Sequence, residues 1–213
     1  ESLFPGTVVR AEPSASDIAK GYAGQIISVM NTYQNFGTFD VAGADLDLSW
    51  HVKTDRYGDF KPSFAATYMY EYKYQFAPGT APVETIGQAN TTGYAPRWKG
   101  NASVAWQNGP VQATVMGRWV GAYRDYDDYN PATPVRKLGN FWMFDASPRY
   151  NIGETLAADS SWLAKTYVTI GGVNILNRLP PYSYYYGTLG VGYDPTQYDI
   201  RGRYLYANFG LKF

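Results

Sequence analysis

Strict alternation between apolar and polar residues runs through much of the chain from Gly43 onward. In the stretch 60–75, phenylalanine and tyrosine dominate the even positions, and mostly polar or small residues fill the odd ones. A period of two is typical of a β-strand with one apolar and one polar face. The stretch is much longer than the usual strand of about five or six residues. It therefore predicts a strand long enough to cross a bilayer at a tilt.

The same pattern predicts seven long strands, at 43–54, 60–75, 97–107, 111–123, 140–150, 166–175 and 201–213. Short turns at 55–59 and 108–110 alternate with long loops at 76–96, 124–139 and 176–199. Short turns on one side and long loops on the other are typical of outer-membrane barrels. The connection 151–165 is long where a short turn is expected, and we expect a helical turn within it.

Residues 1–42 lack alternation over a membrane-spanning length and contain several glycines and prolines. We expect a long surface loop there, with a minor hairpin formed by short apolar pieces at Val8–Val9 and 26–29. The chain thus divides into an extracellular loop region, 1–42, and a strand region, 43–213.

The alternation assigns each strand residue to one of two faces. The residues expected to point outward, toward lipid, are Trp50, Phe64, Tyr68, Val104, Val115, Trp119 and Phe209. The residues expected to point into the lumen are Asp45, Asp47, Thr67, Asn101, Thr114 and Arg118. Outward aromatic residues cluster at both strand ends, around a more aliphatic middle. Two such aromatic belts are typical of membrane barrels.

Composition narrows the classes of function. The 213 residues carry 18 basic and 18 acidic side chains, so the net charge of zero gives no basis for nucleic-acid binding. Cysteine is absent, which excludes disulfides and cysteine-ligated zinc. The mean hydropathy of −0.36 is that of a soluble protein, but alternating strands average to such values. No apolar run of about 18 residues predicts a transmembrane helix.

Asp45, Asp47 and His51 share the lumen side of one strand and are the first candidates for catalysis. Histidine and aspartate form acid–base pairs in enzymes. A lumen face is polar in any case, and neither a nucleophile motif nor a second histidine accompanies them. We therefore expect no catalytic site, no cofactor and no metal.

An acidic loop carries Asp125, Asp127, Asp128 and Asn130, whose oxygen atoms are of the kind that bind Ca²⁺. The spacing lacks the glycine and the distal glutamate of an EF-hand, and this favours a solvated acidic loop.

Aromatic rings are dense in two of the long loops, both expected on the extracellular side. The candidate ligand-binding residues there are Tyr123, Arg124, Tyr126, Tyr129, Tyr182, Tyr184, Tyr185 and Tyr186. Such rings can stack on sugars or on aromatic groups of a siderophore. They can equally pack the loops against each other, and both interpretations remain open at this point.

Several segments, in order, resemble the late strands of TonB-dependent outer-membrane receptors. Segment 169–181, TIGGVNILNRLPP, resembles their penultimate strand and its exit motif. Segments 192–195, GYDP, and 198–204, YDIRGRY, resemble the last loop and final strand. Upstream, Asn35 to Gly37 with Gly43 to Asp45 resembles one strand start, and Gly93 to Asn101 resembles another.

The resemblance implies an all-β fold: an antiparallel transmembrane β-barrel, of which this chain forms the last seven or so strands. Receptors of this family have a 22-stranded barrel with an internal plug. It also implies a place in the bacterial outer membrane, in contact with lipid, and uptake of a scarce, bulky nutrient such as an iron–siderophore complex, vitamin B12 or an oligosaccharide. The expected partners are the N-terminal barrel and plug portion and, through it, the TonB energy-transducing complex.

Two other interpretations are compatible with the pattern. The first is a self-contained small barrel, acting as an enzyme or adhesin, with residues 25–33 as an eighth strand. The second is a soluble β-rich binding module. The receptor interpretation predicts that strand 201–213 pairs with 166–175 and strand 43–54 with 60–75. It also predicts that the two outer strands do not pair with each other.

The terminal strand alternates up to Phe213, an ending that resembles the C-terminal signal read by the barrel-insertion machinery. We expect Phe213→Asp to reduce insertion into outer-membrane fractions strongly, and Lys212→Asp to reduce it little. Equal amounts of both variants in those fractions would contradict the signal.

Overall fold

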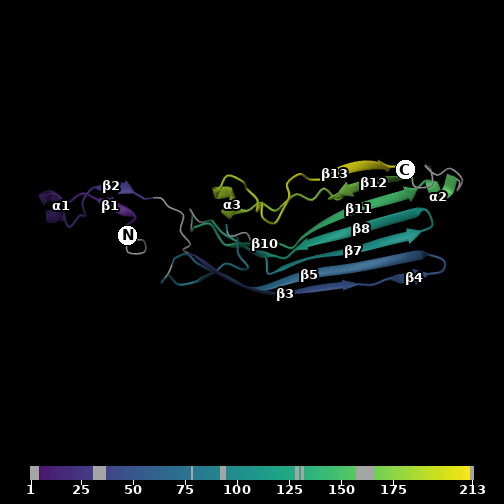
Figure 1. The fold of residues 1–213 in the computed structure, drawn as a ribbon, viewed down its shortest axis with the longest axis horizontal. Helices are drawn as coiled ribbons and strands as arrows, with labels where there is room; N and C mark the ends of the chain where they lie inside the picture. Colours follow the sequence, from purple (N-terminus) through teal and green to yellow (C-terminus); the bar gives the residue numbers. More distant parts are fainter. Residues whose placement is uncertain are drawn as a thin grey trace. The chain divides into compact units, whose positions relative to one another are not determined.

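The structure, a computed structural model, describes residues 5–30, 37–77, 79–91, 95–127, 130, 132–156 and 166–211. Most of the ordered elements belong to one antiparallel sheet (Figure 1). In sheet order, its main strands are β13 (Tyr204–Gly210), β12 (Tyr167–Val173), β11 (Phe141–Asn151), β8 (Val111–Val120), β7 (Trp98–Asn108), β5 (Gly58–Gln75) and β3 (Thr38–Ser49). The short strands β4 (Val52–Thr54) and β6 (Val83–Glu84) also pair with β5.

The sheet is a meander, because each main strand pairs with the next one along the chain. All seven predicted strands are present in it. Both predicted pairings at its ends are confirmed: β13 with β12, and β3 with β5. Among the described residues, β3 and β13 are the two edges of the sheet and do not pair with each other.

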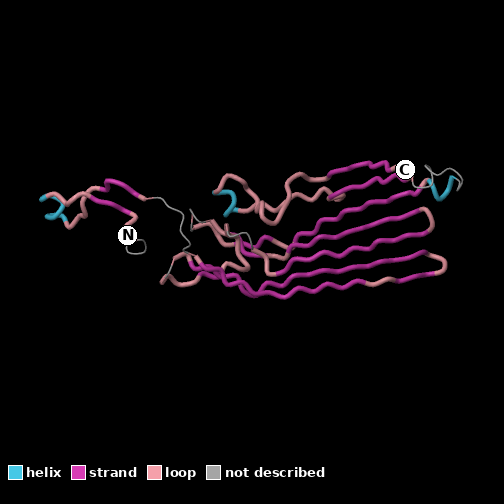
Figure 2. The backbone as a smooth tube through the Cα atoms, in the orientation of Figure 1, coloured by secondary structure: helices cyan, strands magenta, loops and turns pink. Residues whose placement is uncertain are grey.

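Connections lie at two opposite ends of the strands (Figure 2). One end carries the tight turns and the short helix α2 (Gly153–Leu156), which confirms the expected helical turn. The other end carries the long loops with helix α3 (Tyr184–Thr188). The loop predicted at 124–139 contains part of a small hairpin, β9 (Tyr123–Asp125) with β10 (Arg136–Leu138).

The strand predicted at 43–54 begins earlier, at Thr38, and is interrupted before β4. Near the start of β3, the Phe39 ring lies 6.2 Å from the ring of Tyr74 on β5. The interruption lies opposite Pro62, whose carbonyl accepts the Trp50 N–H at 3.0 Å. Proline has no N–H to return, so the ladder is broken at that position.

Strand register fixes which side chains share a face, because directly paired residues point the same way. On one face, Val104 pairs with Val115, and Val168 pairs with Phe209. On the other face, Asn101 pairs with both Ala65 and Arg118. The predicted division into an apolar and a polar face is therefore confirmed on the paired strands.

Two asparagines shape the exit from β12. Asn174 and Asn177 both have φ of 52°, a left-handed conformation that asparagine tolerates better than most residues. The buried Asn174 side chain bonds the backbone N–H and carbonyl of Arg178. The Asn177 side chain accepts the backbone N–H of Arg203 at 3.0 Å, just before β13. This asparagine clasp joins the two bases of the last long loop.

Residues 1–40 and 73–83 form a separate compact unit. It contains β1 (Val8–Arg10) paired with β2 (Ile26–Val29), which confirms the minor hairpin. It also contains a helix that the periodicity did not predict, α1 (Ala15–Lys20). Ser14 and Asp17 form a capping box at its start, and Gly21, with φ of 68°, ends it. These local signals are visible in the sequence.

Some predicted features lie outside the described residues. They are Asn35, Gly93, Asp128, Tyr129, residues 157–165 and Phe213.

The turn glycines Gly58 and Gly109 both have positive φ but different surroundings. A Cβ on Gly58 would collide with the Gln107 carbonyl, whereas one on Gly109 would meet nothing within 4 Å. We expect Gly109→Ala to lower the free energy of unfolding by about 1–2 kcal/mol, the cost of left-handed strain. Gly58→Ala should cost clearly more, because the strand β7 must also shift. Thermal unfolding followed by circular dichroism checks this, and equal losses would contradict the crowding at Gly58.

Candidate functional site

The long loops pack into a buried cluster at one end of the sheet, which we call the loop cluster. Its buried members are Ala89, Ala95, Val120, Tyr123, Leu138, Phe141, Met143, Tyr185, Tyr186 and Tyr198. They come from three loops and from the ends of β8 and β11. Because β8 and β11 contribute polar-face positions, the loops fold over the polar face of the sheet.

Asp125, at the end of β9, is one anchor of this cluster and is fully buried. Its carboxylate accepts the Ser183 hydroxyl at 2.7 Å and the Tyr184 N–H at 2.8 Å, both from the last long loop. Arg136 of β10 donates to the same carboxylate at 3.2 Å. These hydrogen bonds satisfy the buried carboxylate, and they fix the start of α3.

Asp194, in the last long loop, is the opposite anchor and is also fully buried. It accepts the Tyr123 hydroxyl at 2.8 Å, and within its own loop the Thr196 hydroxyl at 2.6 Å. Each loop therefore supplies an aspartate that is bonded by a hydroxyl of the other loop. We call Asp125 and Asp194 the reciprocal anchors.

The candidate ligand-binding residues fall into two groups. Tyr123, Tyr185 and Tyr186 are buried in the loop cluster, and the Tyr186 hydroxyl donates to the carbonyl of Asn90 at 2.6 Å. These three rings pack the loops against each other. Loop packing was one of the two roles considered for the aromatic loop residues. Tyr126 is half-buried against the Tyr185 ring.

The remaining candidates are more accessible. The Tyr182 side chain is 56% exposed and Tyr184 is half-buried, with Arg136 lying over the rings of both. Arg124 is exposed and donates to Gln88 at 3.1 Å. Tyr182, Tyr184 and Arg124 are thus the ones with surface left for a ligand. Tyr129 lies outside the described residues.

The acidic loop does not assemble as a calcium site among the described residues. Asp125 is turned inward as an anchor, while Asp127 accepts the Asn130 N–H at 3.0 Å. No group of three or more acidic, histidine or cysteine side chains that could hold a metal ion occurs in the described part of the chain. Asp128 lies outside it.

The candidates for catalysis, Asp45, Asp47 and His51, do not contact one another in the hydrogen bonds that the structure describes. His51 Nε2 lies 3.3 Å from a carboxylate oxygen of Asp59, and both side chains are substantially exposed. Asp45 instead accepts the Thr67 hydroxyl at 2.6 Å. His51 is thus hydrogen-bonded to Asp59 and not to Asp45 or Asp47, the two residues with which the sequence grouped it.

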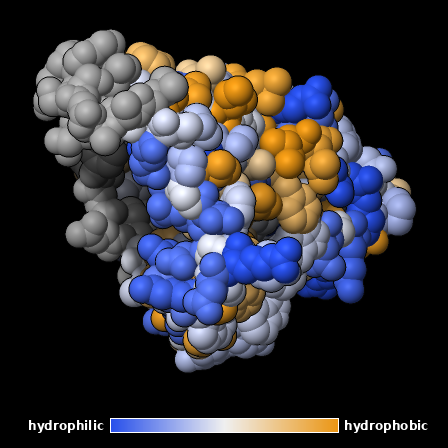
Figure 3. Space-filling view, turned by 90° about the vertical axis from the view of Figure 1, so that its right-hand side faces the viewer, coloured by the Kyte–Doolittle hydropathy of each residue, from blue (hydrophilic) through white to orange (hydrophobic). Residues whose placement is uncertain are grey.

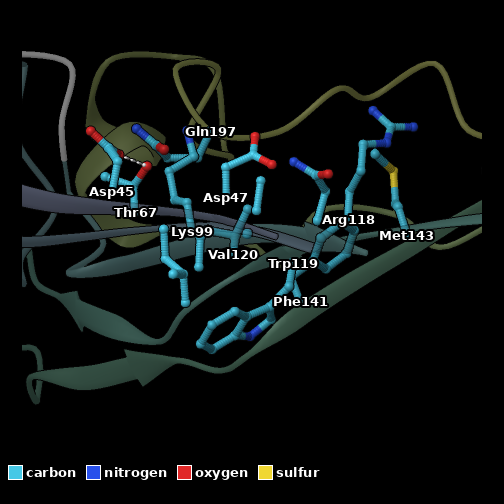
Figure 4. Close-up of a pocket in the computed structure, with 15 residues that line it drawn as sticks. Asp45, Asp47, Thr67, Lys99, Arg118, Trp119, Val120, Phe141, Met143 and Gln197 are labelled. Carbon is cyan, nitrogen blue, oxygen red and sulfur yellow. Dashed lines mark hydrogen bonds between the residues drawn. The ribbon is translucent and has the colours of Figure 1, made fainter. Parts of the chain in front are cut away.

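A hollow of about 440 Å³ lies on the polar face, bordered by the loop cluster. Figure 4 shows Asp47 and Arg118 on the same side of the strands and Trp119 on the opposite side. The polar side chains lining the hollow are Asp45, Asp47, Thr67, Lys99, Asn101, Arg118 and Gln197. Four of these were predicted to share the lumen side with Thr67. The sequence did not predict Gln197 as a lining residue, because it comes from a loop that carries no periodic signal.

Arg118 is held in place at the border of the hollow. Its guanidinium donates to Asp145 on β11 at 2.9 Å, and the same carboxylate oxygen accepts the Asn174 N–H at 2.8 Å. The asparagine clasp and the hollow are therefore connected through one carboxylate.

Comparison with protein-family models, with curated proteins and with solved structures finds no match for this chain. None of the helices in its described part has the length and apolarity that crossing a membrane requires.

Burial raises the pKa of Tyr198 to about 12, and it also raises the pKa of Tyr123 and Tyr186. A raised pKa in the folded state means that folding favours the neutral phenol. The resulting stabilisation is complete below the unfolded value of about 10 and is lost as the pH rises through the folded values. We expect the loop cluster to loosen above pH of about 10, with late tyrosinate absorbance. The variant Tyr198→Phe should show less of this loss; an unchanged pH profile would contradict the burial of Tyr198.

Proposed function

We propose that this chain forms part of the wall of a bacterial outer-membrane β-barrel, the C-terminal strands of a TonB-dependent receptor that imports a bulky nutrient. The observation that carries the proposal is the long, two-faced sheet, whose apolar face is exposed in the part of the chain that the structure describes. The barrel wall performs no covalent chemistry in this role.

The apolar face supports contact with lipid. Val115 is 49% exposed, Ile170 is 62% exposed and Phe209 is 60% exposed, although all three are strand residues. Figure 3 views the molecule end-on from the turn end of the strands, and apolar residues gather in patches on the surface seen there. Soluble proteins rarely expose contiguous apolar patches larger than a few hundred Å², and larger ones mark a protein or membrane contact.

Aromatic side chains on this face lie at both strand ends. At the loop end, Trp119 stacks on Trp142 with centroids 5.8 Å apart, and Trp98 stacks on Tyr68 at 4.4 Å. At the turn end, Phe60 lies 6.5 Å from Trp106. Rings at these two levels are typical of the two membrane–water interfaces.

The two sheet edges support the proposed partner. β3 and β13 have an unpaired side among the described residues, and an unpaired backbone group in hydrocarbon costs several kcal/mol. In our proposal, the N-terminal barrel portion pairs with both edges and supplies the plug and the contact with the TonB complex. The loop residues Arg124 and Tyr182, which are exposed, and Tyr184, which is half-buried, would contact the nutrient from outside.

Neighbouring residues on one strand offer a sharp test. Val104 lies on the apolar face and Ser103 on the polar face of β7, and the chain has no natural cysteine. In outer-membrane preparations, we expect the single variant Val104→Cys to be reached by a lipid-dissolved thiol reagent and not by a water-soluble one. Ser103→Cys should show less access from lipid.

Two results would contradict the proposal. One is water-soluble labelling of Val104→Cys as fast as that of an exposed loop cysteine. The other is recovery of the unmodified chain in the soluble fraction without detergent, which would favour the soluble module.

A further inference from the structure

The hollow on the polar face has a floor of regular geometry. Two cross-strand rows form it: Thr67, Lys99, Val120 and Phe141 in one, and Ala65, Asn101, Arg118 and Met143 in the other. Neighbouring strands lie about 4.8 Å apart, so four strands make a floor about 14 Å wide. The volume of about 440 Å³ falls in the range of sites for small molecules.

The hollow is built on rigid elements. Its floor belongs to strands paired in continuous register, and Asp145 holds Arg118 at one border. At the other border, Thr67 donates to Asp45 at 2.6 Å. Gln197 reaches the hollow from the last loop, where its backbone N–H bonds the carbonyl of the anchor Asp194 at 3.3 Å. A preformed site of this kind binds without a large ordering cost.

The charges around the hollow disfavour an anionic ligand. Both of its cations already interact with carboxylates: Arg118 forms an ion pair with Asp145, and the charge of Lys99 interacts electrostatically with Asp194. Asp45 and Asp47 add two further carboxylates on the β3 side. A phosphate or a multiply anionic chelate would meet more negative than positive charge here.

The hydrogen-bonding groups suit a ligand rich in hydroxyls. Carboxylates accept only, guanidinium and ammonium groups donate only, and the amides of Asn101 and Gln197 do both. A hydroxyl both donates and accepts, so a ring carrying several of them can use every kind of group in the lining.

We propose that this hollow binds one or two sugar rings of a larger neutral, polyhydroxylated ligand. The proposal deepens the proposed function and rests on it, because it names the class of nutrient that passes along this part of the wall. It assigns direct hydrogen bonds to Asp47, Asn101 and Arg118, with Gln197 closing the site from the loop side.

The test uses the protein purified in mild detergent together with any portion that stays paired with its sheet edges. A panel of neutral oligosaccharides is followed by calorimetry on the disaccharides maltose, cellobiose and lactose. We expect at least one neutral sugar to bind. Asp47→Asn, which keeps the shape, and Asn101→Ala should each weaken it about tenfold, as loss of a ligand hydrogen bond does. Gln107→Ala is the matched control, because Gln107 shares the strand and face of Asn101 but lies at the turn end.

Binding to none of the neutral sugars would overturn the proposal, as would tighter binding of maltose phosphate or spermidine. An equal loss of affinity in Gln107→Ala would do so as well. These outcomes are distinct from failure of the proposed function. A chain that reaches the outer membrane but binds no sugar defeats this inference alone. A soluble chain that binds sugar through Asn101 defeats the membrane proposal and leaves the assigned contacts intact.

Discussion

Continuous cross-strand register is the constraint on which the rest of this structure depends. Ten consecutive pairs join β7 to β8, and the same unbroken register joins β8 to β11. A slip of one residue would exchange the faces of an entire strand. It would place Arg118 among tryptophans and Trp119 in the hollow. The apolar surface, the polar floor and the aromatic belts are therefore consequences of one pairing pattern.

The loop cluster depends on a different kind of interaction. Its loops are long and irregular, so they need specific bonds rather than a repeating ladder. The reciprocal anchors supply these bonds, because each buried carboxylate is bonded by donors of the opposite loop. Removing one partner would leave a buried charge short of donors, which costs more than the bond itself contributes. Of the buried tyrosines in the loop cluster, Tyr123 and Tyr185 are hydrogen-bonded directly to these anchors.

The positions of the strands and the faces of their residues were predictable, because alternation with a period of two can be read directly along one strand, such as β5. The helix α1 was predictable too, from Ser14 and Asp17, but periodicity alone does not reveal a helix of six residues. The roles of Asp125 and Asp194 were not predictable. Their partners lie 58 and 71 positions away in the sequence, and an acidic loop residue is usually solvated. For the same reason Gln197 could not be assigned to the hollow.

The asparagine clasp has a consequence for how such a chain tolerates change in length. Asn177 holds the backbone at Arg203, so the two ends of the segment between them are fixed independently of what lies between. Closing a longer flexible segment costs only about 0.6 kcal/mol for each doubling of its length. Insertions there would thus leave the register of the last strand unchanged. The clasp separates a part of the molecule that is free to diversify from a part that must stay constant.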